Sequence, residues 1–265
     1  GFFMHTVGHN TVMVDGKRQA DPRDPASDAG TLHAYAPDGR VRLIDVSAEG
    51  AYPGRVSQYR RTCLLVHAGG RDCYAVDLFR VAGGRQHDWI LHGGRSRVSA
   101  DWKPPPAEPG TLAGSDVPYG SFFDDIRFER ERRGEIDYSR YEGSGFQFLE
   151  NPRRAQPKGT YACTWRCEPS PLDPIELRIH CLADGEEAIL CEGKPQRGSK
   201  IDSVPFLVRR RMGNNLQSAF LAVLEPCRKD PFIQEVKAGK KPLSLTVSHA
   251  YGTDEIEFDS DGVRV

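Results

Sequence analysis

The sequence has no long hydrophobic run and no excess of charge of either sign. No apolar stretch approaches the roughly 20 residues that a helix needs to cross a bilayer, and the first residues lack the basic, apolar and small-residue pattern of a signal peptide. The 36 basic and 37 acidic side chains give a formal net charge of -1. This near-balance removes the electrostatic case for nucleic acid or an acidic membrane as a partner. Contact with a polyanion must therefore be local.

The chain also lacks the cysteine pairs that hold a metal or a disulfide framework. It has seven cysteines, an odd number, and Cys163 and Cys167 are the one closely spaced pair. A zinc knuckle needs a second pair at similar spacing, which Cys181 and Cys191 do not supply. We interpret the thiols as core-filling, most clearly Cys63, which lies in an apolar strand, and Cys73, which begins another.

An initiator methionine is absent, and the apolar start at Gly1 is abrupt. We expect the chain to be a piece of a longer protein. Any signal peptide of that protein would then lie upstream of Gly1, so its absence here excludes little.

Amphipathic helices of three turns are lacking as well, and short alternating segments take their place. Strands are predicted at residues 11–14, 40–46, 59–66, 73–79, 175–179, 206–210, 219–224, 243–247 and 255–258. The 27 glycines and 19 prolines supply the turns that such a chain needs. This pattern predicts an all-β fold, an antiparallel β-sandwich, whose 265 residues can bury a sizeable core.

The middle of the chain differs from the rest. Residues 102–120 are rich in proline, glycine and alanine, a composition that cannot form a central strand, and 124–133 is dense in charge of both signs. We predict one domain over residues 1–265, in which 1–100 contains the first strands, 101–140 is a loop-rich insertion and 141–265 contains the remaining strands. A domain boundary in the insertion is the alternative.

The most informative motif is the run from Gly8 to Gly16, Gly-His-Asn-Thr-Val-Met-Val-Asp-Gly. Its alternation predicts a strand with Val12 and Val14 on one face, and the Asp-Gly pair predicts a tight turn that makes this strand a hairpin arm. His9 and Asn10 then lie at the mouth of a sheet. A histidine there can act as a general base, bind a metal or make structural hydrogen bonds.

Two further groups of polar residues are candidates for the same site. Tyr52 lies in a turn between two predicted strands, where catalysis and a loop aromatic that caps the core are about equally good interpretations. Gln58 and Arg60 share one side of the next strand, and Arg61 lies on the other. One arginine can bind a carboxylate or sulfate through its planar fork, while the other forms a structural salt bridge.

These motifs together resemble the β-sheet domain of the heparinase II/III-like polysaccharide lyases. The resemblance rests on the run from Gly8 to Gln19, on Tyr52-Pro53-Gly54 followed by Arg60-Arg61-Thr62, and on Tyr74-Ala75-Val76-Asp77 with His87-Asp88-Trp89 and His92. Residues 206–211 and 217–226 resemble the closing strands of that domain. The match covers most of the chain apart from about 102–140.

The resemblance implies a fold and a reaction. In that family an incomplete α/α toroid precedes the sheet domain, which is a two-layered antiparallel β-sandwich of the super-sandwich type. An acidic polysaccharide such as a glycosaminoglycan or alginate lies in the cleft between the two domains and is cleaved there by β-elimination. The resemblance implies that His9 and Tyr52 are catalytic and that the protein is periplasmic or secreted. We also expect Asn10, Gln58 and Arg60 to bind substrate. This chain alone, without the toroid, is expected to be inactive.

The resemblance also implies a structural zinc, which this sequence makes doubtful. Val7 stands where several members have the first histidine of a His-x-His pair, although His5 is close by, and Gln58 stands where they have the third zinc ligand. An amide is a poor zinc ligand. The candidate replacements for this ligand are His33, Asp21, Asp24 and Asp28. No other cofactor is expected.

Two other functions remain open. One is a carbohydrate-binding or structural module of the same ancestry without turnover, and the other is a sandwich that mediates protein contacts. An upstream helical region bearing Asn, His and Tyr would favour the lyase, and a bare signal peptide would favour a binding module.

Overall fold

The chain folds as three stacked antiparallel sheets. The computed structural model describes residues 5–21, 23, 27, 30–121, 141–167, 175–194, 201–228, 230–259 and 262–265. Within these residues the helical segments are short 3-10 turns, namely η2 (Thr6–Gly8), η3 (Glu49–Ala51) and η5 (Phe146–Phe148). None of them has the length or hydropathy of a membrane-spanning helix.

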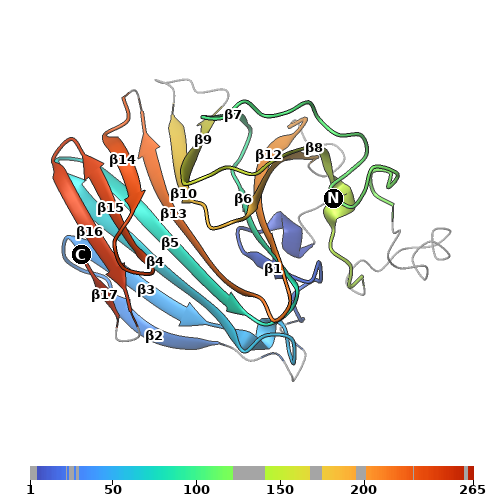
Figure 1. The fold of residues 1–265 in the computed structure, drawn as a ribbon, viewed down its shortest axis with the longest axis horizontal. Helices are drawn as coiled ribbons and strands as arrows, with labels where there is room; N and C mark the ends of the chain where they lie inside the picture. Colours follow the sequence, from blue (N-terminus) through green and yellow to red (C-terminus); the bar gives the residue numbers. More distant parts are fainter. Residues whose placement is uncertain are drawn as a thin grey trace.

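The largest sheet has eight strands and forms the middle layer (Figure 1). Its order is β2 (Thr31–Ala36), β3 (Val41–Ser47), β4 (Gln58–Gly69), β5 (Asp72–Ala82), β13 (Gln217–Cys227), β10 (Glu176–Leu182), β9 (Thr160–Cys167) and β7 (Ser96–Ala100). All its neighbours pair antiparallel, because the strands are joined by reversals of direction rather than by crossover helices.

Two smaller sheets cover the two faces of the middle layer. The five-stranded sheet has the order β1 (Val12–Val14), β6 (Gln86–His92), β12 (Val204–Met212), β11 (Glu187–Gly193) and β8 (Leu149–Ala155). The four-stranded sheet has the order β14 (Ile233–Ala238), β15 (Ser244–His249), β16 (Gly252–Phe258) and β17 (Val263–Arg264). The predicted antiparallel sandwich is therefore confirmed, and the four-stranded sheet adds a layer that the sequence analysis did not foresee.

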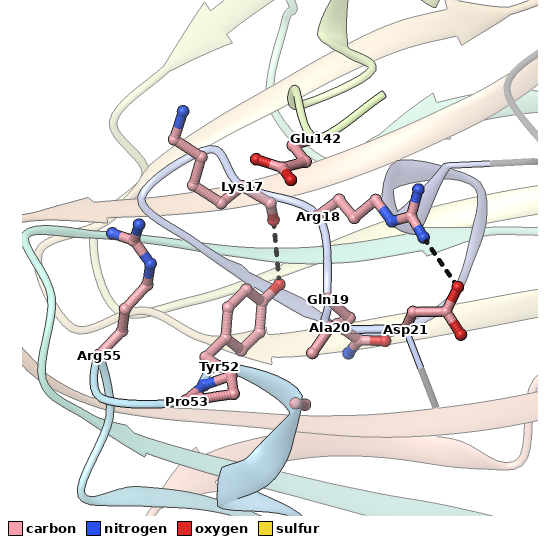
Figure 2. A pocket seen from close by; sticks show the side chains of 10 residues that line it. Lys17, Arg18, Gln19, Ala20, Asp21, Tyr52, Pro53, Arg55 and Glu142 are labelled. Atoms are coloured by element: carbon pink, nitrogen blue, oxygen red, sulfur yellow. Dashed lines mark hydrogen bonds and ion pairs between the residues drawn. The ribbon is translucent and has the colours of Figure 1, made fainter. Parts of the chain in front are cut away.

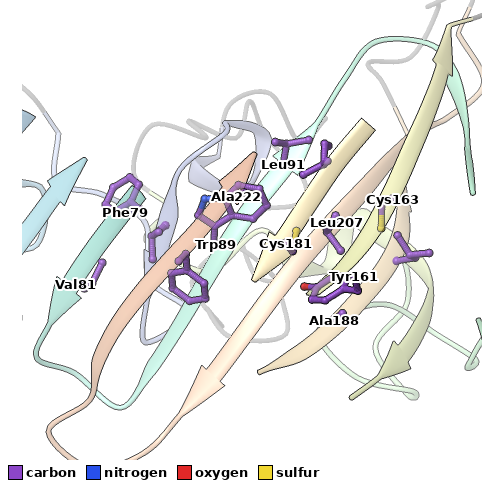
Figure 3. Close-up of a cluster of buried hydrophobic side chains, with 14 of the residues drawn as sticks. Phe79, Val81, Trp89, Leu91, Tyr161, Cys163, Cys181, Ala188, Leu207 and Ala222 are labelled. Carbon is purple, nitrogen blue, oxygen red and sulfur yellow. The ribbon is translucent and has the colours of Figure 1, made fainter. Parts of the chain in front are cut away.

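Alternating side chains divide the interior into separate cores, as strand geometry requires. Between the five-stranded and eight-stranded sheets lie Trp89, Phe79, Leu207 and Tyr161 with their neighbours (Figure 3). A second core fills the space between the eight-stranded and four-stranded sheets, and a third covers the other face of the five-stranded sheet. Trp89 is thus a core residue, and its indole Nε1 donates to Asp77 at 3.2 Å.

The first strand forms as its pattern predicts. Val12 and Val14 point into the core between the sheets, while Met13 points into the third core. Asp15 and Gly16 have φ values of 53° and 58°, which a two-residue turn of this hand requires. The hairpin partner is only a bridge from Val14 to Lys17, and the full ladder of β1 is made with β6 instead.

Two other expectations concern the loop-rich insertion and the cysteines. Residues 102–121 contain no strand, whereas 124–133 lies outside the described residues. All seven cysteines are free. The expectation that Cys63 and Cys73 are the most clearly core-filling was wrong, because both are only half-buried while Cys163, Cys181 and Cys191 are fully buried.

Candidate functional site

His9 lies between η2 and β1, at the edge of the five-stranded sheet. Its side chain is exposed, and its backbone N–H donates to the Thr6 carbonyl at 3.1 Å. Within the described part of the chain, its imidazole has no hydrogen bond or ion pair. A ring that is fixed at its backbone and free at its nitrogens can exchange a proton with a bound molecule.

Both neighbours of His9, Gly8 and Asn10, are tied to β6 by one residue, His92. The Asn10 side chain accepts from the His92 N–H at 2.8 Å and donates to the His92 carbonyl at 3.2 Å. The His92 ring contacts the Gly8 carbonyl through Nε2 at 2.9 Å and stacks on Phe206. The amide of Asn10, predicted to bind substrate, is thus engaged with backbone groups.

Arg61, on β4 of the eight-stranded sheet, contacts the segment that carries His9. Its guanidinium forms a bidentate ion pair with buried Asp77, at 2.7 and 3.1 Å, and Nη1 donates to the Asn10 carbonyl at 2.9 Å. Arg61 thus links β4 and β5 to the segment that carries His9. Arg61 forms a structural salt bridge, as Arg60 also does with Asp45, and it places a cation beside Asn10.

Tyr52 follows η3, and its side chain is buried. Its hydroxyl donates to the carbonyls of Val12 at 3.4 Å and Lys17 at 3.3 Å (Figure 2). Burial, together with the neighbouring Tyr59 phenol, raises the pKa of Tyr52 well above its usual value. Because the hydroxyl is buried, it can exchange a proton with a sugar only if the segment from Val12 to Lys17, whose carbonyls accept its hydrogen bonds, moves away. The structure therefore brings Tyr52 to β1, but with its hydroxyl turned onto backbone.

Tyr59, which the sequence analysis did not select, also forms hydrogen bonds with the residues that follow His9 in the chain. Its hydroxyl donates to the Val12 carbonyl at 2.5 Å and meets Thr11 Oγ1 at 2.8 Å and Gln19 Nε2 at 2.9 Å. Burial raises its pKa to about 12, against the effect of these hydrogen bonds. The alternation of β4 indicates that Tyr59 faces inward, but no local signal indicates its partners.

A cavity of about 360 Å³ lies beside Tyr52 (Figure 2). Its lining carries charges of both signs, from Lys17, Arg18, Arg55, Asp21 and Glu142. Arg18 is within 3.7 Å of Asp21, and Arg55 is within 4.0 Å of Asp15, so these cations are partly neutralised. The cavity is therefore polar without a strong net charge.

Gln58 and Arg60 do not join His9. They lie on the face of β4 opposite Arg61, and Arg60 forms a bidentate pair with buried Asp45, at 2.9 and 2.5 Å. The sequence pattern separates the two arginines correctly but does not reveal which face the first strand covers. The grouping of Gln58 and Arg60 with Asn10 at one substrate site therefore does not match this geometry.

The described residues do not fit the zinc site that the resemblance implies. No group of three or more His, Cys, Asp or Glu side chains gathers within them. His5 is buried with its Nδ1 unpartnered, but its ring packs against Phe148 and Tyr141 rather than against further metal ligands, and burial lowers its pKa to about 4. Asp21 binds Arg23, and His33 is exposed on β2, while Asp24 and Asp28 lie outside the described residues.

Comparisons with known proteins give a structural likeness without a sequence match. No protein-family model and no curated protein matches the chain. Among solved structures, a heparinase III gene product has a TM-score of 0.50 at 11% identity, covering 95% of this chain. The heparan sulfate lyase HepC from Pedobacter heparinus has a TM-score of 0.47 at 12% identity, and another heparinase III has 0.42 at 12%.

The chain spans about 30% of the length of these structures. At this identity the likeness shows the fold alone. The chain thus has the fold of the β-sheet portion found in the heparinase III structure, which agrees with the fold that the sequence motifs predict.

Proposed function

We propose that this chain is the β-sheet domain of a polysaccharide lyase that cleaves uronic-acid-containing polysaccharides by β-elimination. The single observation that carries the proposal is His9, an exposed imidazole with no internal partner among the described residues, whose two neighbours are both bound to His92, Gly8 through its carbonyl and Asn10 through its side-chain amide. The fold shared with heparinase III supports it. We also propose a periplasmic or secreted location.

In the proposed reaction, His9 exchanges a proton with one sugar ring. A base removes the proton at C5, electrons of that C–H bond form the C4–C5 double bond, and the C4–O4 bond breaks. An acid then protonates O4, which leaves as a new chain end. A cation or amide must neutralise the uronate carboxylate while C5 is deprotonated, because that step places further negative charge on the carboxylate oxygens. We propose that an upstream α/α toroid supplies this group.

Tyr52 remains the proposed second proton-transfer group. Because its side chain is buried, the test must distinguish a catalytic phenol from a packing residue. In the longest natural protein that contains this chain, Tyr52→Phe removes the hydroxyl and keeps the ring. A catalytic phenol predicts loss of most unsaturated product. If product formation stays at the wild-type rate, Tyr52 is a packing residue and the second group lies elsewhere.

Product chemistry tests the proposal as a whole. Heparan sulfate and alginate are incubated with that protein, and the products are followed by ultraviolet absorbance and mass spectrometry. A lyase gives products with a C4–C5 double bond, which absorb in the ultraviolet. Products that have gained one water per cleavage would show a hydrolase and contradict the proposal. Binding of either polymer without cleavage would instead favour the alternative, a non-catalytic carbohydrate-binding module.

A further inference from the structure

The five-stranded sheet covers only part of the inner face of the middle sheet. Its edge strand β1 lies over β4, as the contacts of Arg61 with Asn10 and of Tyr59 with Val12 show, and β6 lies over β5 through Trp89 and Asp77. Among the strands that the structure describes, none lies above β3 and β2, the strands beyond β4, on this face. The result is a step, with the segment of His9 and Asn10 at its edge and β2 to β4 as its floor.

The floor of this step carries large apolar side chains that are open to solvent. Leu32, Tyr35, Ile44 and Val46 are 61%, 64%, 43% and 37% exposed. The register places Tyr35 beside Ile44 and Leu32 beside Val46, and Val46 in turn beside Arg61. Four such neighbours form a contiguous apolar patch, which marks a binding surface more often than chance exposure does.

A cation without an internal partner lies in the same patch. Arg42 is exposed and points to the same face as Ile44, and within the described residues its guanidinium has no ion pair or hydrogen bond. With Tyr35, Ile44 and Leu65 it lines a shallow depression of about 470 Å³. The acidic residue of β3, Asp45, points to the opposite face, where it binds Arg60.

These features select the ligand. A sugar ring has an apolar face that packs on an aromatic side chain, and a carboxylate or sulfate on the ring pairs with guanidinium. A second copy of the chain fits less well. In a two-fold contact the same patch meets itself, and the strands of this patch offer no carboxylate on that face to pair with Arg42.

We infer that the uncovered face of β2 to β4 binds an acidic saccharide chain, with Tyr35 stacking on one sugar ring and Arg42 pairing with its carboxylate or sulfate. The site continues from His9 and Asn10 across Arg61 to the sheet edge, so the polymer lies across the strands. The inference rests on the proposed function for the ligand class, and on the exposed patch and Arg42 for the location.

Isothermal titration calorimetry of this chain tests the inference without cleavage. The probes are a heparan sulfate hexasaccharide, an alginate hexasaccharide and neutral maltohexaose. We expect at least one acidic probe to bind and maltohexaose not to bind. Tyr35→Ala and Arg42→Gln should each weaken binding at least fivefold. Matched controls are Tyr251→Ala, an exposed tyrosine near the four-stranded sheet, and Arg71→Gln, an exposed arginine between β4 and β5.

Three outcomes of the titrations would overturn the inference. They are no binding of either acidic probe to the wild type, unchanged affinity in both patch variants, and equal losses in the patch and control variants. If Tyr35→Ala instead lowers Tm or changes the oligomeric state while affinity stays, the patch is a protein contact and the inference is also wrong. Normal lyase activity in the patch variants with unchanged KM would contradict the patch but leave the proposed function standing, whereas binding without β-elimination would do the reverse.

Discussion

At the residue scale, the feature that sets His9 apart is the engagement of its neighbours. Asn10 and Gly8 both contact His92, so the backbone that carries the imidazole is held on each side while the ring stays in solvent. A proton-transfer group needs this combination of a fixed position and free nitrogens. We therefore propose that Asn10 positions His9 in the candidate site.

Asn10→Ala tests that role. The change leaves the N–H and carbonyl of His92 without their side-chain partner, and we expect a loss of about 1–2 kcal/mol in the free energy of unfolding. We also expect a fall in kcat larger than any change in KM, because the position of His9 is disturbed. Urea unfolding and steady-state kinetics measure both. Gln217→Ala, at an exposed strand position, is the control and should change stability by less than about 0.5 kcal/mol. A large KM effect with unchanged kcat would indicate direct substrate binding by Asn10.

The phenol of Tyr59 should ionise late. Its pKa is raised to about 12 by burial, so the folded state keeps the proton at pH values where an ordinary tyrosine has lost it. A raised folded pKa means that this contribution to stability is complete below the unfolded pKa and is lost as the pH rises toward about 12. Ultraviolet difference titrations of the wild type and Tyr59→Phe should coincide up to about pH 11. Divergence near pH 10, with circular dichroism showing a folded chain, would contradict the burial of this hydroxyl.

At the element scale, the ion pair of Arg61 with Asp77 joins β4 and β5, and Trp89 of β6 donates to the same carboxylate. Arg61→Ala leaves Asp77 buried without its cation, and we expect a loss of about 3 kcal/mol in stability. The control is Arg264→Ala, which breaks the exposed pair with Asp259 and should cost less than about 1 kcal/mol. Thermal and urea unfolding compare the two. Equal losses in both variants would show that the buried pair has no special weight.

The same element scale shows where sequence patterns succeed. Residues of β3, β4, β5, β12 and β13 alternate clearly because each has at least one face against a core, so their strands were predicted within a few residues. The strand β2 was missed because nearly all its residues are exposed and no alternation of burial marks it. The four-stranded layer was missed because alternation shows that a face is buried but not which sheet buries it.

Sequence patterns likewise predict only part of the candidate site. His9 was placed at the mouth of a sheet because the strand signal begins two residues later in the chain. The burial of Tyr52 was not predictable, since the carbonyls that accept its hydrogen bonds belong to residues 35 and 40 positions away. The separation of Arg60 from Asn10 likewise depends on which face of β4 the first strand covers.

At the scale of the whole molecule, two buried carboxylates hold the four-stranded sheet on the middle layer. Glu225 of β13 accepts from the N–H groups of Phe232 and Ile233 at 2.6 and 2.7 Å, and Asp254 of β16 accepts from Tyr74 of β5 at 2.6 Å. Burial raises the pKa of both carboxyls, but the hydrogen bonds and nearby cations outweigh it and leave both pKa values below normal. The layer is therefore docked by ionised groups.

This docking predicts acid sensitivity. Because the folded pKa values are depressed, the stability contribution is present above the unfolded pKa and is lost as the pH falls through the folded one. Hydrogen exchange at pH 7 and about pH 2.5, which lies below the ordinary pKa values of both carboxyls, should show β14 to β16 losing protection before β10 and β13. Glu225→Gln should loosen this layer already at pH 7. Uniform loss of protection across all three sheets would contradict separate docking.

The central claim is that His9 transfers a proton in a β-elimination, and one rate measurement tests it most directly. The initial rate of unsaturated product formation is measured by ultraviolet absorbance for the wild type and His9→Ala, in the longest natural protein that contains this chain. A general acid or base contributes typically 10²- to 10⁴-fold, so the account predicts a loss of at least about 100-fold with substrate binding retained. A rate for His9→Ala within a few-fold of the wild type would contradict it.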